Sequence, residues 1–193
     1  MDILEALTTR RSRGKMRQDV PSRELIERVL EAGVHAPNHH DTQPWRFFVL
    51  TREARSEFGE VLAQALKQRL GEGVADAAVL EAQMRGERAK PMRSPVLIVV
   101  GVSCDHDDEM TRREDLQAAS AALQNMLIAA NVLDLAAIWR TGDGAYDDSV
   151  KAHFSLRPQD EIAGILYLGY PDETLPPMPE RTREYASKTE WRG

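Results

Sequence analysis

Two uninterrupted apolar segments constrain the fold of this chain more than any other feature of its sequence. They are residues 95–102 (PVLIVVGV) and 162–170 (IAGILYLGY), and each has the length of one β-strand. Alternate side chains of a strand point to opposite faces of a sheet, so a strand that is apolar throughout must be covered on both faces. We therefore expect two buried strands, with residues 95–102 at the centre of a sheet that helices flank.

Helical periodicity and turn residues predict the elements around these strands. Asp2 and Glu5 form a capping pair for a first helix that ends near Arg10 and has Ile3, Leu4 and Leu7 as its apolar face. Thr51 is the expected cap of a helix over 53–70, which Gly71 and Gly73 end. The other predicted elements are helices over 22–36, 113–133 and 148–154, strands over 46–50 and 136–139, and an extended Pro-rich arm over 171–193.

The polar segment 74–93 is predicted to form a helix followed by a loosely packed loop. Two interpretations of its role stay open, a lid over a pocket and solvated surface. No internal repeat or linker divides the chain, and 193 residues suffice for one domain with a full core. We therefore expect residues 1–193 to form a single domain.

Charge and cysteine content exclude several classes of protein. The formal net charge is −6, whereas a general nucleic-acid binder needs a basic surface. Cys104 is the single cysteine, so neither an intrachain disulfide nor a multi-cysteine metal site is expected. The opening residues do not resemble a secretory signal, and no apolar run is long enough to span a membrane. These features predict a cytoplasmic protein that binds neither nucleic acid nor a membrane.

A local excess of cationic residues near the amino terminus nevertheless predicts an anion site. The residues that contribute are Arg10, Arg11, Arg13, Lys15, Arg17 and Arg23. In an acidic protein, a phosphorylated small molecule fits such a cluster better than a polymer does.

Several common catalytic motifs are absent. No Gly-x-Gly-x-x-Gly turn and no nucleophile elbow occur in the sequence. His35, His39 and His40 lack the spacing of metal ligands, and two adjacent histidines on a loop are expected to point apart. No metal is therefore expected.

Three short segments instead carry residues suited to a flavin. They are Arg10-Arg11-Ser12, residues 36–45 with Gln43-Pro44-Trp45 at the end, and Trp139-Arg140-Thr141-Gly142. Arginine guanidinium groups match the phosphate of FMN in charge and geometry, and a hydroxyl such as that of Ser12 adds a neutral hydrogen bond. In a purely structural alternative, Arg10 and Arg11 lie at the carboxyl end of the first helix, where the helix dipole favours cations, and the tryptophans are core aromatics.

The order and spacing of these segments resemble the nitroreductase family, in particular its small bacterial, NAD(P)H-dependent branch, from the first helix to Gly169. The resemblance implies an α+β fold in which a central mixed or antiparallel sheet is flanked by helices. It also implies a homodimer with two FMN sites at the interface, for which the helix over 113–133 is the best dimer element. The implied flavin contacts are Arg10, Arg11, Ser12, Trp139, Arg140 and Thr141 from one chain and His35 and His39 from the other.

The resemblance further implies the reaction. NAD(P)H passes a hydride to flavin N5 and leaves, and a small oxidant such as a nitroaromatic or a quinone replaces it in a ping-pong cycle; no side chain need act as acid or base in the first half. A nicotinamide contact would fall at Ala129, Ala130, Asn131, Val132, Leu133 and Asp134, where Asp134 replaces an expected glycine. Two alternatives stay open, namely a flavoenzyme of another reaction class, such as reductive dehalogenation or flavin cleavage, and a non-enzymatic flavin-binding protein.

Overall fold

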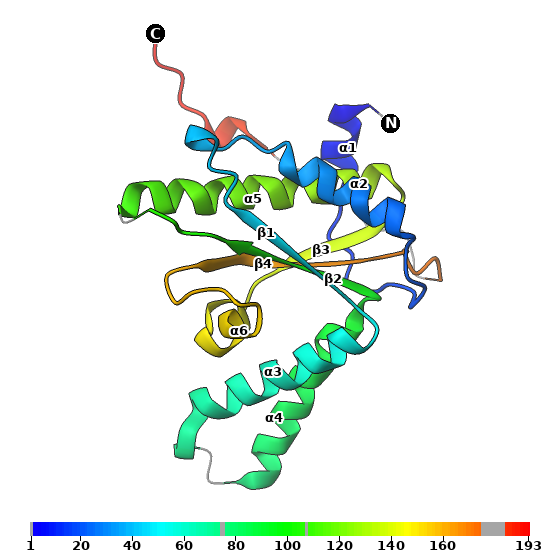
Figure 1. Ribbon diagram of the computed structural model, residues 1–193. Helices are drawn as coiled ribbons and strands as arrows, with labels where there is room; N and C mark the ends of the chain where they lie inside the picture. Colours follow the sequence, from blue (N-terminus) through cyan, green and yellow to red (C-terminus); the bar gives the residue numbers. More distant parts are fainter. Residues whose placement is uncertain (1, 74–75, 107, 175–183) are drawn as a thin grey trace.

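The computed structural model describes residues 2–73, 76–106, 108–174 and 184–193. Within these ranges, four strands form an antiparallel sheet in the order β1-β2-β4-β3 (Figure 1). The strands are β1 (Trp45–Thr51), β2 (Val96–Val102), β3 (Ala136–Arg140) and β4 (Glu161–Gly169). The two apolar segments thus occupy the middle of the sheet, which confirms the prediction from their composition.

The strand register explains why both middle strands are apolar throughout. Ile98 of β2 lies opposite Val49 of β1 on one side and Leu166 of β4 on the other. All residues of β2 are buried. Val96, Ile98, Val100 and Val102 join the core on one face of the sheet, and Leu97 and Val99 join the core on the other. Alternate side chains of β2 therefore pack into two separate hydrophobic cores, one on each face of the sheet.

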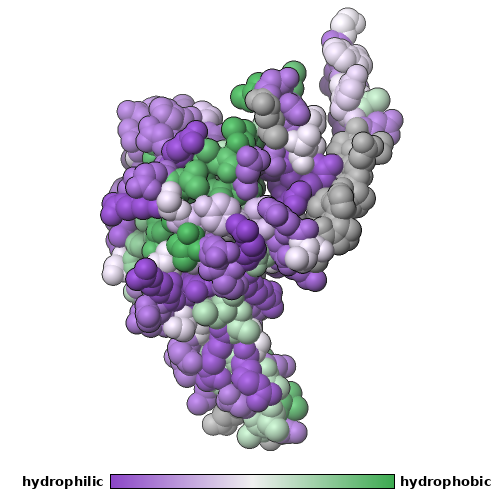
Figure 2. All heavy atoms as spheres, turned by 90° about the vertical axis from the view of Figure 1, so that its right-hand side faces the viewer, coloured by the Kyte–Doolittle hydropathy of each residue, from purple (hydrophilic) through white to green (hydrophobic). Residues whose placement is uncertain are grey.

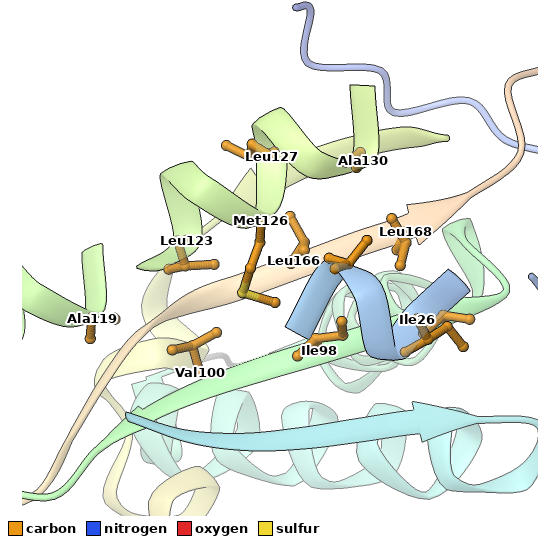
Figure 3. Packing of buried hydrophobic residues seen from close by; sticks show 14 of the residues in the cluster. Ile26, Ile98, Val100, Ala119, Leu123, Met126, Leu127, Ala130, Leu166 and Leu168 are labelled. Carbon is orange, nitrogen blue, oxygen red and sulfur yellow. The ribbon is translucent and has the colours of Figure 1, made fainter. Parts of the chain in front are cut away.

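Helices α2 (Arg23–Val34) and α5 (Glu109–Val132) cover one face of the sheet, and α1 (Ile3–Thr9) lies beside them (Figure 1). Met126 of α5 points toward Ile98 and Val100 of β2 (Figure 3), and Leu123 and Leu127 belong to the same core. Leu123 and Met126 are completely buried, as expected where a helix closes the core of the sheet.

Helices α3 (Glu53–Leu70) and α6 (Asp148–His153) lie on the opposite face (Figure 1). There Phe58 of α3 packs with Leu97, Val99 and Ile165 of the sheet. Helix α4 (Ala77–Ala89) packs along α3, and the two project together away from the sheet. Hydrophilic side chains predominate on this projecting end, whereas apolar ones gather in the upper half of the same view (Figure 2).

The prediction of a loosely packed loop within 74–93 is wrong. Asp76 caps α4, which buries Met84 against Ala63 and Leu66 of α3, and residues 74–75 lie outside the described ranges. The short 3-10 turn η3 (Pro91–Arg93) follows, and both Pro91 and Ser94 are buried. Few apolar residues carry this packing, since Leu80 and Met84 of α4 meet Ala63, Leu66 and Leu70 of α3.

Two further boundaries differ from the prediction. Helix α5 begins at Glu109, four residues before the predicted start, because the side chain of Asp108 accepts a hydrogen bond from the Thr111 amide at 2.8 Å. Thr51 does not cap α3, since it still pairs with Val96 in the sheet. The cap position belongs to Arg52, whose φ of 48° lies in the left-handed region.

The remaining short elements are the 3-10 turns η1 (His39–Asp41), η2 (Gly71–Gly73), η4 (Asp143–Tyr146) and η5 (Ala186–Lys188). Residues 184–193 are exposed and include η5, whereas 175–183 of the predicted arm lie outside the described part. Among the helices that the structure describes, none has the length and hydropathy needed to cross a membrane.

Candidate flavin site

The segment after α1 lies against β3, which brings two of the three predicted motifs together. Ser12 forms a parallel bridge with Ala137, and the Arg13 amide donates to the Ala137 carbonyl at 2.9 Å. Farther along, the Arg17 amide donates to the carbonyl of Tyr170 at 3.1 Å. Residues from opposite parts of the chain thus form one wall along the outer edge of the sheet.

Gly14 and Arg140 approach each other closely in this wall. A Cβ at Gly14 would lie 3.1 Å from Nη2 of Arg140, so a larger residue at position 14 would push against the guanidinium. The other side of that guanidinium faces the ring of Tyr167, with 5.5 Å between Cζ and the ring centroid. Burial raises the pKa of the Tyr167 hydroxyl, and the charge of Arg140 offsets part of that rise. Arg140 is therefore held between a glycine and a neutral aromatic ring.

Arg11 has a structural role as well as a candidate binding role. Its Nη1 donates to the carbonyls of Thr8, Thr9 and Arg10 at 2.8, 3.0 and 3.0 Å, so it caps the carboxyl end of α1. This geometry is what the structural alternative predicts. However, Nε of Arg11 and Nε of Arg140 are buried and have no hydrogen-bond partner in the part of the chain that the structure describes. Arg10 is half-buried at the end of the same helix.

Trp139 and Thr141 flank Arg140 but point to different environments. The indole of Trp139 packs on Gly164, where a Cβ would lie only 2.0 Å from Nε1, and Nε1 donates to the Ala163 carbonyl at 3.2 Å. Trp139 therefore fixes β3 against β4, as a core aromatic does. Thr141 is exposed directly after β3, and Gly142 follows with a φ of 117°, which turns the chain away.

His35 and His39 lie elsewhere in the same chain. His35 ends α2 and is exposed, with Nε2 3.4 Å from Oε1 of Glu31. His39 lines an open groove of about 520 Å³ together with Pro37, Asn38, Glu114, Gln117, Ala118 and Ala121. Contrary to the sequence-based expectation, His39 and His40 do not point apart, because their ring centroids are 3.9 Å from each other. The left-handed backbone of His40, with φ 54°, allows this contact, in which the ring planes are tilted by 58°.

Two contacts along helix α5 show how far His39 lies from α1, the helix that precedes Arg10 and Arg11. His39 lies beside Gln117, whereas the amide nitrogen of Asn131 donates to the Ala6 carbonyl and the Thr9 hydroxyl of α1, each at 3.3 Å. A helix rises 1.5 Å per residue, so these two points are about 20 Å apart along α5. The structure therefore brings the segment that follows Arg10 and Arg11 against β3, with Ser12 at Ala137 and Gly14 at Arg140, but leaves His39 at a distance within one chain.

The predicted nicotinamide segment 129–134 is divided between core and surface. Ala130 is completely buried in the core, and Asn131 ties α5 to α1 as described above. Ala129, Val132 and Leu133 line a second groove of about 360 Å³ that also includes Ile3 and His35. Asp134 has a φ of 55°, the backbone region that favours the glycine expected at this position.

A buried contact between Thr42 and Asp115 was not predicted from the sequence. The Thr42 hydroxyl donates to Oδ1 of Asp115 at 2.7 Å, and Asp115 is 3% exposed. The sequence pattern that could have indicated this contact is the position of Asp115, an acidic residue one turn before Ala118 and Ala119 on the otherwise apolar face of α5. Across the ranges that the structure covers, no group of three His, Cys, Asp or Glu side chains is placed to hold a metal ion.

The sequence and the fold are both similar to those of known proteins. The family model described as "Nitroreductase family" matches residues 7–170. The chain is 36% identical over 171 residues to an Escherichia coli K12 protein named "Putative NAD(P)H nitroreductase YdjA", covering 89% of each chain. A nitroreductase-like family protein from Bacillus cereus has a similar fold, with a TM-score of 0.84 at 21% identity over 100% of this chain and 96% of that one. A Bacteroides fragilis nitroreductase with bound FMN gives a TM-score of 0.78 at 21% identity over all of both chains.

Proposed function

The chain belongs to the nitroreductase family, and from this premise we propose that it is an FMN-dependent oxidoreductase. It takes a hydride from NAD(P)H and reduces a nitroaromatic, a quinone or a similar small acceptor in a ping-pong cycle. The observation that carries the proposal is the contact of the segment after α1 with β3, in which Ser12 bridges Ala137 and Gly14 meets Arg140. The name of the E. coli relative and the FMN bound to the B. fragilis protein support the donor and the cofactor. Residues 1–193 would act as one domain in the cytoplasm, as the single cysteine favours.

The residues along β3 fit the phosphate of FMN. A phosphate monoester carries nearly two negative charges and accepts several hydrogen bonds. Arg11 and Arg140 each have a buried Nε without a hydrogen-bond partner among the described residues, and a buried donor of this kind is unfavourable unless a ligand satisfies it. Arg10, Arg11 and Arg140 would hold the phosphate, while Ser12 and Thr141 would hydrogen bond to the phosphate or the ribityl chain.

Bound FMN supplies the hydride acceptor and donor of the reaction, its N5 atom. The chain's own contribution is positioning. Trp139 holds β3 against β4, and Tyr167 and Gly14 confine the guanidinium of Arg140, so the cationic groups are in place before a ligand arrives. Segment 129–134 is the proposed contact for the nicotinamide donor. No side chain is required to exchange a proton during hydride transfer from NAD(P)H.

The proposed active unit is a homodimer. Ile3, Leu4 and Leu7 of α1 are 72, 70 and 45% exposed, and Val34 and Val132 nearby are 41 and 47% exposed. A helix whose apolar stripe faces solvent indicates a missing partner surface. The groove that holds Ile3, His35 and Val132 belongs to the same surface. A second copy packed there would bring its His35 and His39 to the flavin held by Arg10, Ser12 and Arg140. Within one chain, His39 lies about 20 Å along α5 from the contact of that helix with α1.

The test of this proposal uses the purified protein and its absorption spectrum. The expected result is a yellow protein that releases FMN on denaturation and that, without oxygen, oxidises more than one equivalent of NADH or NADPH per flavin only when a nitroaromatic or quinone is present. Product analysis separates nitro reduction from dehalogenation or flavin cleavage. Binding of FMN without any turnover would support a flavin carrier, and failure to bind FMN after reconstitution would overturn the proposal.

A further inference from the structure

We propose that Thr42 and Asp115 are positioning residues of the flavin site, because together they hold the loop that carries His39. The inference rests on the proposed function, in which His39 of one subunit faces the flavin of the other. The 2.7 Å hydrogen bond between the Thr42 hydroxyl and Oδ1 of Asp115 joins the loop to α5.

Asp115 occupies a core position where an apolar residue would be more stable. Its side chain is 3% exposed, and its second oxygen, Oδ2, has no hydrogen-bond partner in the described ranges. Burial of a carboxylate that is only partly satisfied is unfavourable compared with an apolar side chain of similar volume. Packing therefore does not explain Asp115, whereas its bond to Thr42 does.

The loop that Thr42 anchors has a strained backbone. His40, Asp41 and Gln43 have φ values of 54, 53 and 44°. These lie in the left-handed region, which residues other than glycine rarely adopt. Such conformations persist only where surrounding contacts hold them, and they cluster at functional sites. At the base of the loop, Oδ1 of Asn38 accepts from the Gln43 amide at 2.9 Å. The Pro44 carbonyl, at the end of the loop, accepts from the Ser103 amide at 2.8 Å, and the Thr42–Asp115 bond attaches the middle of the loop to α5.

His39 depends on this loop for its position. Within the described part of the chain its imidazole makes no hydrogen bond, and its ring contact is with His40, which belongs to the same loop. The backbone carbonyl of His39 accepts from the Thr42 amide at 3.3 Å. Thr42 is thus bonded to His39 on one side and to α5 on the other, so the Thr42–Asp115 bond sets where His39 stands in the groove.

The test compares variants that remove the bond with variants that keep it. Thr42→Val and Asp115→Ala remove it, whereas Thr42→Ser and Asp115→Asn retain a hydroxyl donor and an oxygen acceptor. Ser56→Ala, which loses an exposed hydroxyl bond to Glu53 on α3, is the control. Two quantities are measured for each protein, namely the FMN dissociation constant of the apoprotein and the amide hydrogen-exchange rate of residues 38–43 without FMN.

Loss of a hydrogen bond to a charged acceptor corresponds to a change of about tenfold or more in an equilibrium constant. We therefore expect Thr42→Val to weaken FMN binding about tenfold and to accelerate exchange in the loop. Thr42→Ser, Asp115→Asn and Ser56→Ala stay close to wild type. Because the two residues act as a pair, Thr42→Val combined with Asp115→Ala is no worse than Asp115→Ala alone.

The possible results distinguish failure of this inference from failure of the proposed function. If Thr42→Val binds FMN as tightly as wild type, the inference is wrong, whether or not the loop exchanges faster. If the loop of Thr42→Val exchanges at the wild-type rate, the pair does not hold the loop, and the inference is again wrong. If the wild-type protein itself binds no FMN, the proposed function fails, and the exchange rates alone decide whether the pair fixes the loop. The Thr42 variants keep the test decisive should Asp115→Ala not fold.

Discussion

Gly14 and Arg140 meet at the edge of the sheet, where a Cβ on the glycine would lie 3.1 Å from Nη2 of the arginine. The glycine therefore leaves the space in which the guanidinium rests. Since Arg140 also stacks on Tyr167, it has little freedom to move away. This relationship links a small residue near the amino terminus to a cation more than half a chain away.

Replacement of Gly14 by valine tests that link. The branched side chain displaces the Arg140 guanidinium, and loss of a well-aligned charge-assisted bond to phosphate weakens FMN binding by about tenfold. FMN titration of the apoprotein measures the effect. Gly86→Val in α4 is the control, because no atom lies within 4 Å of a Cβ there. Unchanged FMN affinity in Gly14→Val would show that Arg140 does not bind the flavin from its present position.

Charge reversal at Arg10 is expected to cause a larger loss. A charge-assisted hydrogen bond contributes about 1.5–3 kcal/mol, and a glutamate adds repulsion from the phosphate, so Arg10→Glu should weaken FMN binding at least about a hundredfold. Arg85→Glu on exposed α4 is the matched control. Arg69 is unsuitable as a control, since it pairs with Asp143 at 3.0 Å in the turn after Thr141. Equal flavin retention in the Arg10 and Arg85 variants would restrict Arg10 to a structural role.

The exposed face of α1 is predicted to be the subunit interface. Leu4→Glu places a charge where the second copy would pack, so the variant should sediment as a monomer at concentrations where the wild type is a dimer. Val79→Glu is the control, because Val79 is a 47% exposed apolar residue on the projecting helix α4. Analytical ultracentrifugation decides the matter, and a Leu4→Glu dimer as tight as wild type would place the interface elsewhere.

Cys104 is expected to be unreactive while the protein is folded. It is 3% exposed, and burial raises the pKa of its thiol from 9.0 to about 11, with smaller contributions from Glu161, Asp160 and Asp115. Iodoacetamide at pH 8 should therefore label the folded protein far more slowly than the urea-unfolded protein. Rapid labelling of the folded protein would contradict the buried position.

The same pKa shift predicts a pH effect on stability. The unfolded thiol loses its proton first, so its contribution to stability is present below pH 9 and declines as the pH rises toward 11. Urea unfolding at pH 8 and pH 10.5 should show a smaller pH-dependent loss of stability in Cys104→Ala than in wild type. An identical loss in both proteins would mean that another group dominates in this range.

The sequence was sufficient to predict the elements whose physical signals are local. The apolar runs of β2 and β4, the start of α2 next to Ser22 and the glycine end of α3 each depend on a few neighbouring residues. The bridge between Ser12 and Ala137 was not predictable in this way, because it depends on how α1 and β3 meet in space. Only the resemblance to a family suggested that the two segments share a site.

The errors at Thr51, at His39–His40 and in segment 74–93 have a common cause. In each case the tertiary structure overrides a local preference. Thr51 remains in the sheet, the left-handed backbone of His40 brings its ring into contact with that of His39, and α4 packs apolar residues on α3. The role of the Asp115 carboxylate could likewise not be predicted from its neighbours in sequence, because its partner Thr42 is brought beside it by the fold.

The central claim is that each flavin site takes Arg10 from one subunit and His39 from the other. The most direct measurement mixes equal amounts of Arg10→Glu and His39→Glu proteins, lets the subunits exchange, and counts the bound FMN. In a twofold-symmetric dimer, each heterodimer then has one intact site and one site with both lesions, so random exchange restores about a quarter of the wild-type sites. If both residues instead served the same subunit's flavin, every site would carry one lesion. Verified heterodimers that bind no more FMN than the two parent variants would contradict the account.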